Sequence, residues 1–107
     1  MIGADAAVNV SAASISTGSL NAAIDNSSVG GGGNIVGSAN INFNLTGDLT
    51  TSGEANFLID NSSGGTIDGN TAINVDAANI TANSLLAQIN NTSGVLGGDA
   101  TVNVTAA

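Results

Sequence analysis

A short phrase of alternating apolar and polar residues returns seven times along this chain. The third, fifth and seventh positions of each phrase are apolar or small, and the positions between them are mostly polar. Because successive side chains of a β-strand point to opposite faces, this alternation predicts half-buried strands. The phrases begin roughly 14 to 19 residues apart, as expected when turns vary in length and strands do not. They cover residues 4–11, 18–25, 37–44, 53–60, 69–76, 83–90 and 98–105.

A strand this short cannot bury its apolar side alone, so it must stack on its neighbours. The sequence therefore predicts one all-β domain over residues 1–107, a parallel β-solenoid with no cap at either end. The fifth and seventh positions supply the predicted core: Val8, Val10, Ile24, Ile41, Phe43, Phe57, Ile59, Ile73, Val75, Ile89, Val102 and Val104. A second apolar column, expected in a short strand or bend that closes each coil, consists of Ile2, Ile15, Ile35, Leu49, Ile67, Ile80 and Leu96.

Two coil sizes are compatible with this repeat. One phrase per coil gives about seven narrow coils of roughly 16 residues, which would stack into a rod roughly 34 Å long. A longer period lies over the short one, because alternate phrases end in the same kind of turn, and this gives superrepeats of roughly 30 residues. One wide turn per superrepeat is the alternative. We expect the narrow coil, because the phrase recurs in both halves of the superrepeat and bulky residues are few.

The turns after alternate phrases contain a recurring asparagine. Asn26, Asn61 and Asn91 occupy one equivalent site, and stacked amides there could form a hydrogen-bonded ladder. The alternative is that asparagine simply suits a turn. Glycine-rich turns are expected to supply positive φ angles at residues 29–34, 64–65 and 97–98.

The amino-acid composition excludes several classes of function. The chain has no Lys, Arg, His, Cys, Pro, Trp or Tyr, and its formal net charge is −8. Without a cationic side chain it cannot pair with phosphates, which excludes strong nucleic-acid binding and disfavours anionic membrane surfaces. It also has no His or Cys for nucleophilic catalysis and no Lys or Arg to activate a substrate, and no stretch approaches a membrane span. We therefore expect no enzymatic activity, no cofactor, no nucleic-acid partner and no membrane insertion.

The acidic residues offer one candidate site. In narrow coils Asp60 and Asp76 would lie on adjacent layers about 5 Å apart, where they could hold Ca²⁺ or act as a glycosidase pair. A solvated edge of the sheet explains the same residues more simply, and no aromatic platform is available for a sugar ring. The outward face is rich in asparagine, and a flat lattice of amides at strand spacing could order water, which makes ice binding a further alternative.

The phrasing also resembles a known family. Strands such as Gly98-Asp99-Ala100-x-Val102-x-Val104 and turns such as Asn61-Ser62-Ser63-Gly64-Gly65 are similar to the passenger repeats of filamentous haemagglutinin-like adhesins and autotransporters. The likeness runs from Ile2 to Thr105. It implies a right-handed parallel β-helix that is secreted across an outer membrane and displayed as a stalk or adhesive fibre. It implies no catalytic residues, because the matched positions are packing and turn sites.

These observations predict a structural, non-enzymatic β-helical segment of a bacterial surface adhesin or extracellular fibre. The alternative is a self-assembling fibre subunit that stacks head to tail. The expected partners are the chain itself, through end-to-end or lateral association, flanking repeats of a longer chain, or a host or matrix surface. The expected location is extracellular or at the cell surface.

Overall fold

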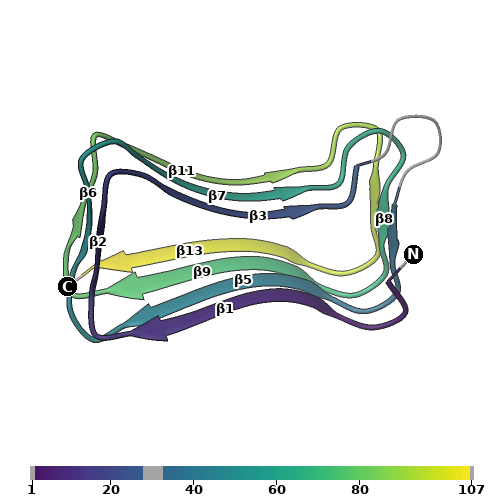
Figure 1. Cartoon of the computed structure of the whole chain (residues 1–107). Helices are drawn as coiled ribbons and strands as arrows, with labels where there is room; N and C mark the ends of the chain where they lie inside the picture. The colour runs from purple at the N-terminus through teal and green to yellow at the C-terminus, as the bar shows by residue number, and fades with distance from the viewer. Residues whose placement is uncertain (1, 28–32, 107) are drawn as a thin grey trace.

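The computed structural model describes residues 2–27 and 33–106. This part of the chain is all-β and winds through about three turns of a β-solenoid, each turn passing through two long strands and two short ones (Figure 1). The strands are β1 (Ala6–Ala12), β2 (Ile15–Thr17), β3 (Leu20–Asp25), β4 (Asn34–Ile35), β5 (Ala39–Leu45), β6 (Leu49–Thr51), β7 (Glu54–Asp60), β8 (Thr66–Ile67), β9 (Thr71–Ala77), β10 (Ile80–Thr81), β11 (Ser84–Asn90), β12 (Val95–Leu96) and β13 (Ala100–Ala106).

Each turn has four sides, and each side belongs to a parallel sheet (Figure 1). The first long face is formed by β1, β5, β9 and β13, and the second long face by β3, β7 and β11. One short side is formed by β2, β6 and β10, and the other by β4, β8 and β12. Ile2 adds a single bridge to this last sheet through its pairing with Ile35.

The expectation of seven narrow coils is not met. Ala6 pairs with Ala39 and Ala39 pairs with Thr71, so each phrase lies on the second phrase along the chain and not on the next one. Successive phrases run along opposite long faces, and one turn takes a whole superrepeat. Four strands at the usual sheet spacing give a stack roughly 14 Å deep. The molecule, which measures 39 × 21 × 17 Å, is therefore longest along its long strands and not along the stacking axis (Figure 1).

The core lies between the two long faces. Ile41, Phe57, Ile59 and Ile73 have no exposed surface, because alternate residues of both faces point into the same narrow interior. Phe43, from the first long face, meets Phe57, from the second, edge to face with ring centroids 5.0 Å apart. Burial of each large apolar side chain contributes about 1.5–3 kcal/mol.

Predicted core residues in the outermost layers are less buried than those in the middle. Val8, Val10 and Ile89 are half-buried and Ile24 is 9% exposed. Val102 and Val104 are 43% and 40% exposed, although they pair with the fully or almost fully buried residues of β9 in the same inward columns. Their alternation is the one expected, but no described strand lies beyond β13 to cover them.

The second apolar column occupies the short sides. Leu49 lies between Ile15 and Ile80, and Ile67 lies between Ile35 and Leu96. The middle residues of both columns are fully buried. The short strands therefore close the coil at both ends of its long interior. The sequence predicted a single such column, whereas the wide coil divides its residues between two short sides.

Candidate functional site

Asn26, Asn61 and Asn91 stack inside the corner that follows the second long face. The Nδ2 atom of Asn26 donates to Oδ1 of Asn61 at 2.7 Å, and Nδ2 of Asn61 donates to Oδ1 of Asn91 at 2.7 Å. Asn61 is fully buried and Asn26 is 6% exposed. We call these three residues the inner ladder. Buried amides are tolerated only when they are hydrogen-bonded, so the ladder ties the three turns to one another.

Backbone carbonyls complete the inner ladder. Asn26 also donates to the carbonyl oxygen of Thr66 at 3.0 Å, and Asn61 donates to those of Val95 at 3.0 Å and Gly65 at 3.2 Å. Each amide therefore joins its own turn to the next one. Asn61, the middle residue of the inner ladder, therefore has more hydrogen-bond partners than Asn26 or Asn91.

Glycines make room for the inner ladder. A Cβ atom on Gly65 would lie 2.5 Å from Oδ1 of Asn61, and one on Gly94 would lie 2.5 Å from Oδ1 of Asn91. The sequence predicted positive φ angles for residues 64–65 and 97–98. That is confirmed for Gly64, with φ at 85°, and wrong for the other three, which serve close approach instead. The glycine-rich turn predicted for residues 29–34 lies largely outside the described residues.

The residue before each inner rung points outward and fixes the turn. Oδ1 of Asp25 accepts hydrogen bonds from the backbone amide and the hydroxyl of Ser27, and Oδ1 of Asp60 accepts the amide of Ser62. The hydroxyl of Ser27, and then its amide, lowers the pKa of Asp25 below the ordinary 3.8, because both bonds favour the charged carboxylate. These short-range bonds set the turn geometry that places the next side chain inside.

A second ladder runs along the outer surface of the first long face. Asn42 donates to Asn9 at 2.9 Å, Asn74 donates to Asn42 at 2.9 Å, and Asn103 donates to Asn74 at 3.0 Å, in each case from Nδ2 to Oδ1. We call these four residues the outer ladder. The sequence indicated outward amides but did not predict this ladder. Its signal is an asparagine at the sixth position of every odd-numbered phrase.

The two ladders have opposite polarity. Donors of the inner ladder point toward the C-terminal turns, and donors of the outer ladder point toward the N-terminal turns. On the second long face Asn56 donates to Asn21 at 3.2 Å, and Leu86 takes the third place in that row. Among the described strands, only those of the first long face therefore carry an unbroken outward row of asparagines.

A third set of bonds lies at the corner before the first long face. The amide of Ser38 donates to Oδ1 of Asp5 at 2.8 Å, the amide of Asn70 to Oγ of Ser38 at 3.1 Å, and the amide of Asp99 to Oδ1 of Asn70 at 3.1 Å. Each of these side chains thus accepts a hydrogen bond from a backbone amide of the following turn. The repeated polar residues of this chain are used chiefly to join turn to turn.

The predicted pairing of Asp60 with Asp76 does not form. Asp60 lies on the second long face in register with Asp25 and Asn90, whereas Asp76 lies on the first long face in register with Asn44. The pairing was wrong because it assumed narrow coils, and wide coils send consecutive phrases to opposite faces. Among the described residues, no three acidic side chains gather closely enough to hold a metal ion.

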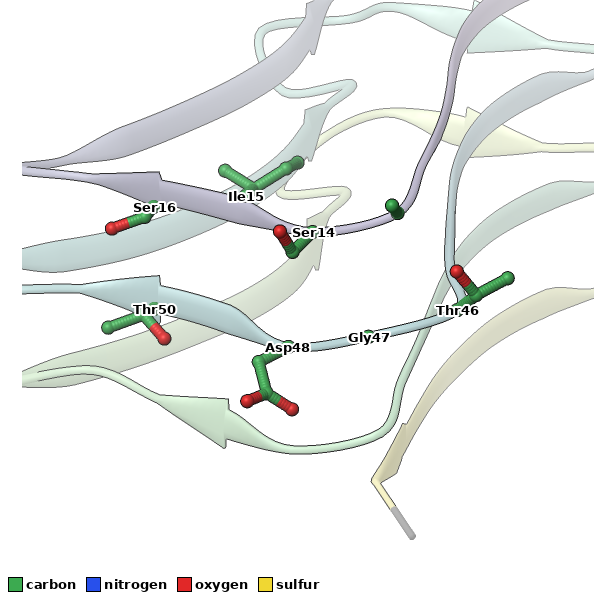
Figure 2. A pocket seen from close by; sticks show the side chains of 8 residues that line it. Ser14, Ile15, Ser16, Thr46, Gly47, Asp48 and Thr50 are labelled. Carbon is green, nitrogen blue, oxygen red and sulfur yellow. The ribbon is translucent and has the colours of Figure 1, made fainter.

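An open groove of about 500 Å³ crosses the corner between the first long face and β2 and β6 (Figure 2). The side chain of Asp48 points toward the third turn (Figure 2). There its Oδ1 accepts a hydrogen bond from Nδ2 of Asn79 at 2.9 Å. Apart from the apolar Ile15, the remaining lining is small or hydroxylated: Ala13, Ser14, Ser16, Thr46, Gly47 and Thr50. Ser16 and Thr50 are paired in register on neighbouring strands. This groove can offer hydroxyl groups and a carboxylate to a ligand, but neither a cation nor an imidazole.

Comparisons of the chain with protein-family models, with curated proteins and with solved structures find no match. In the described part of the chain, no helix has the length and hydropathy needed to cross a bilayer.

Proposed function

We propose that this chain is a structural, non-enzymatic segment of a bacterial surface adhesin or extracellular fibre, and that its solenoid is right-handed. One observation carries the proposal: inner ladder, outer ladder and corner bonds all run from turn to turn through the height of the stack. Residues that a binding or catalytic site would present singly are here repeated in register. Such repetition favours a rigid scaffold whose faces act as spacer or contact surface.

The surface chemistry supports the same proposal. The outward positions of the first long face hold only Ala, Asn, Ser, Thr and one Asp, so this face is flat and almost uncharged. An acidic chain without lysine or arginine resists trypsin and remains soluble at neutral pH. These properties suit an exported segment exposed to host proteases. The resemblance to adhesin passenger repeats, stated from the sequence, supports the surface location.

Surface display tests the location. We would insert the chain into the passenger of an outer-membrane display protein and follow an epitope placed beyond it. We expect the passenger to reach the surface and the inserted segment to survive added subtilisin. The matched control carries Ile59→Asp, which should disrupt the solenoid and expose the segment to cleavage. Periplasmic arrest or rapid degradation of the parent segment would overturn the proposed surface role.

Assays on a panel of glycans test the non-enzymatic part of the proposal. Asp60 and Asp25 are the carboxylates that lie in register on neighbouring strands, so they form the closest analogue of a glycosidase pair. Each, however, has an oxygen engaged in its own turn. We expect no hydrolysis by the parent chain. Turnover that is lost in Asp60→Asn and retained in Asp76→Asn would show an enzyme instead.

The outer ladder favours a second candidate function, the ordering of water. Its four amides repeat at strand spacing on a flat face, which is the arrangement that an ice-binding surface would need. The neighbouring row of Ala7, Asn40, Ala72 and Thr101 is irregular, which weakens this candidate. Thermal hysteresis in the parent that disappears in Asn42→Leu would support it.

A further inference from the structure

Eight asparagines of this chain belong to the motif Asn-x-Ser/Thr, in which x is any residue except proline. In exported proteins this motif accepts glycans on the side-chain nitrogen of its asparagine. A chain so rich in Asn, Ser and Thr contains the motif by chance, so the structure has to decide which copy a transferase can use. The eight acceptor positions are Asn9, Asn26, Asn44, Asn61, Asn79, Asn90, Asn91 and Asn103.

Seven of these eight side-chain amides take part in hydrogen bonds that hold turns or corners together. Asn79 donates to Asp48, and Oδ1 of Asn90 accepts both the backbone amide and the hydroxyl of Thr92. A transferase would have to break such bonds, or to draw out a buried side chain, before it could reach these amides. The other five belong to the two ladders: Asn9, Asn26, Asn61, Asn91 and Asn103.

Asn44 differs from the others in its surroundings. It lies in register with Ser11 and Asp76, so its row on the first long face holds no second amide. Asn42 lies two residues earlier on the same face, in the row of the outer ladder. In the part of the chain that the structure describes, no hydrogen bond engages either polar atom of the Asn44 side chain. Its Nδ2 atom can therefore react without the loss of a contact that joins the turns.

The motif of Asn44 spans the end of β5. Leu45 is buried, whereas Asn44 and Thr46 on either side of it are exposed and point outward. The pairing of β5 with β9 ends at Asn44, and Thr46 lies on the segment that connects β5 with β6 (Figure 2). The acceptor and the hydroxyl that the motif requires therefore share one surface, at the corner where the chain leaves the sheet. Since β5 lies between β1 and β9, this exposure is that of an internal layer.

The open groove lies next to this motif. Thr46, the third residue of the motif, is part of the lining of the groove, together with hydroxyl groups from the first two turns and the carboxylate of Asp48 (Figure 2). Hydroxyl and carboxylate oxygens are suitable hydrogen-bond partners for the hydroxyl groups of a sugar. The first sugar on Asn44 would therefore have a hollowed polar surface beside it.

We infer that Asn44 is the site at which an asparagine glycosyltransferase attaches a glycan to this chain. The donor is a sugar activated by a diphosphate at its anomeric carbon, C1. Nδ2 of Asn44 forms a bond to C1, the bond between C1 and the diphosphate oxygen breaks, and the diphosphate leaves with that electron pair. One proton of Nδ2 passes to a base of the transferase. This modification goes beyond the structural role proposed above and does not rest on it.

A glycan at Asn44 would change the surface of the first long face. Among the outward side chains of that face, Asp76 is the one that carries a charge. A sugar chain adds bulk and hydration beside Asp76. We expect it to hinder lateral packing of this flat face on another surface.

Transfer to the folded full chain in vitro tests the inference. One reaction contains a soluble asparagine glycosyltransferase with a nucleoside-diphosphate sugar, and the other a membrane oligosaccharyltransferase with a polyprenyl-diphosphate-linked oligosaccharide. Mass spectrometry of peptides from an elastase digest locates the sugar. We expect modification at Asn44 and at none of the other seven positions, and the reaction that succeeds identifies the carrier of the sugar. A folded parent chain that neither enzyme modifies at Asn44 would overturn the inference.

Matched variants test each residue of the motif. Asn44→Gln removes the acceptor and Thr46→Val removes the hydroxyl at nearly constant volume, so both should abolish transfer, whereas Thr46→Ser should retain it. Thr105→Val makes the same change in the motif of Asn103, whose amide is engaged in the outer ladder, and should leave transfer to Asn44 unchanged. Circular dichroism verifies that the variants are folded. Transfer that persists in Thr46→Val, or that moves to another asparagine in Asn44→Gln, would contradict the assigned site.

A destabilised chain tests whether the fold makes the selection. Ile59→Asp should unravel the solenoid and release the engaged amides, so we expect it to be modified at several of the eight positions. Modification of the folded parent at several positions, as in this variant, would overturn the selection of Asn44 by the fold.

The outcomes separate this inference from the proposed function. A chain that is displayed intact on the cell surface but is not modified at Asn44 would overturn this inference alone. A chain that is modified at Asn44 but fails to reach the surface would overturn the surface location alone.

Discussion

The side-chain amide of Asn61 donates to Oδ1 of Asn91 over 2.7 Å in the interior of the turn, where Asn61 has no exposed surface. The same amide group accepts from Asn26 on its other side. One residue thus holds three successive turns in register through a polar contact. A buried ladder of this kind stabilises the fold only while every amide in it is hydrogen-bonded, because an unpaired buried amide is costly.

Replacing Asn61 with alanine should therefore destabilise the fold more than an equivalent loss on the outer surface. Asn61→Ala removes the acceptor of Asn26 inside the corner and the donor to Oδ1 of Asn91, although Asn26 keeps its bond to the carbonyl oxygen of Thr66, and we expect a loss of about 2–4 kcal/mol in the free energy of unfolding. Asn42→Ala removes the same number of rungs from the outer ladder and should cost about 1 kcal/mol, since water replaces the lost bonds. Denaturant titrations of both variants measure the difference. Equal losses would contradict the assigned importance of the inner ladder.

Glycine at position 65 is expected to be irreplaceable for reasons of space. A Cβ atom there would lie 2.5 Å from Oδ1 of Asn61 and 2.7 Å from the carbonyl oxygen of Asn26. We expect Gly65→Ala to reduce the free energy of unfolding by about 2–3 kcal/mol through overpacking. Gly3→Ala, where nothing lies within 4 Å, serves as the control and should change stability by less than about 0.5 kcal/mol. Thermal and denaturant melts compare the two, and a tolerant Gly65 would show that the corner can widen.

The assignment of inward and outward faces predicts opposite effects for neighbouring residues of β7. Ile59 is fully buried, so Ile59→Asp should place an unpaired charge in the core and cost several kcal/mol, enough to unravel the surrounding turns. Leu58 is the adjacent residue on the outward side, and Leu58→Asp should leave the fold intact. Far-ultraviolet circular dichroism during thermal melting distinguishes these outcomes. Similar melts for both variants would disprove the face assignment.

Asp25 should titrate below its ordinary pKa of 3.8, because the hydroxyl and the amide of Ser27 favour its charged form. A folded pKa below the unfolded value means that Asp25 stabilises the fold above the unfolded pKa, and that this contribution disappears as the pH falls through the folded pKa. We expect Ser27→Ala to raise the pKa of Asp25, as followed by the carboxyl carbon resonance in NMR titrations. Ser16→Ala, on the opposite short side, is the control and should leave it unchanged.

The faces of the strands were predictable from the alternation within each phrase, whereas the width of the coil was not. Alternation within a phrase determines which residues point inward, and Ile41, Phe57 and Ile73 are accordingly buried. The phrase does not determine which strand lies next to it, because both long faces use the same alternation. The decisive signal was the turn after Asp25, Asp60 and Asn90, which follows only alternate phrases and so marks one side of a wide coil.

The candidate site was likewise predictable from the sequence only in part. The three members of the inner ladder could be identified because they follow alternate phrases at equivalent turn positions, but their direct stacking requires the wide coil, which makes alternate phrases neighbours. The pairing of Asp60 with Asp76 depended on strand order, so it failed when the order proved different. The use of Gly65 and Gly94 as space for an amide could not be predicted, because it depends on the distance between atoms of neighbouring turns.

The opposite polarity of the two asparagine ladders has an electrical consequence. Amide dipoles aligned along the inner ladder point one way and those of the outer ladder point the other, so their fields largely cancel along the stacking axis. Lengthening such a stack adds little to its axial dipole moment, unlike a growing α-helix. Orientation in an applied electric field should therefore depend on the distribution of carboxylates, and hardly at all on the number of turns.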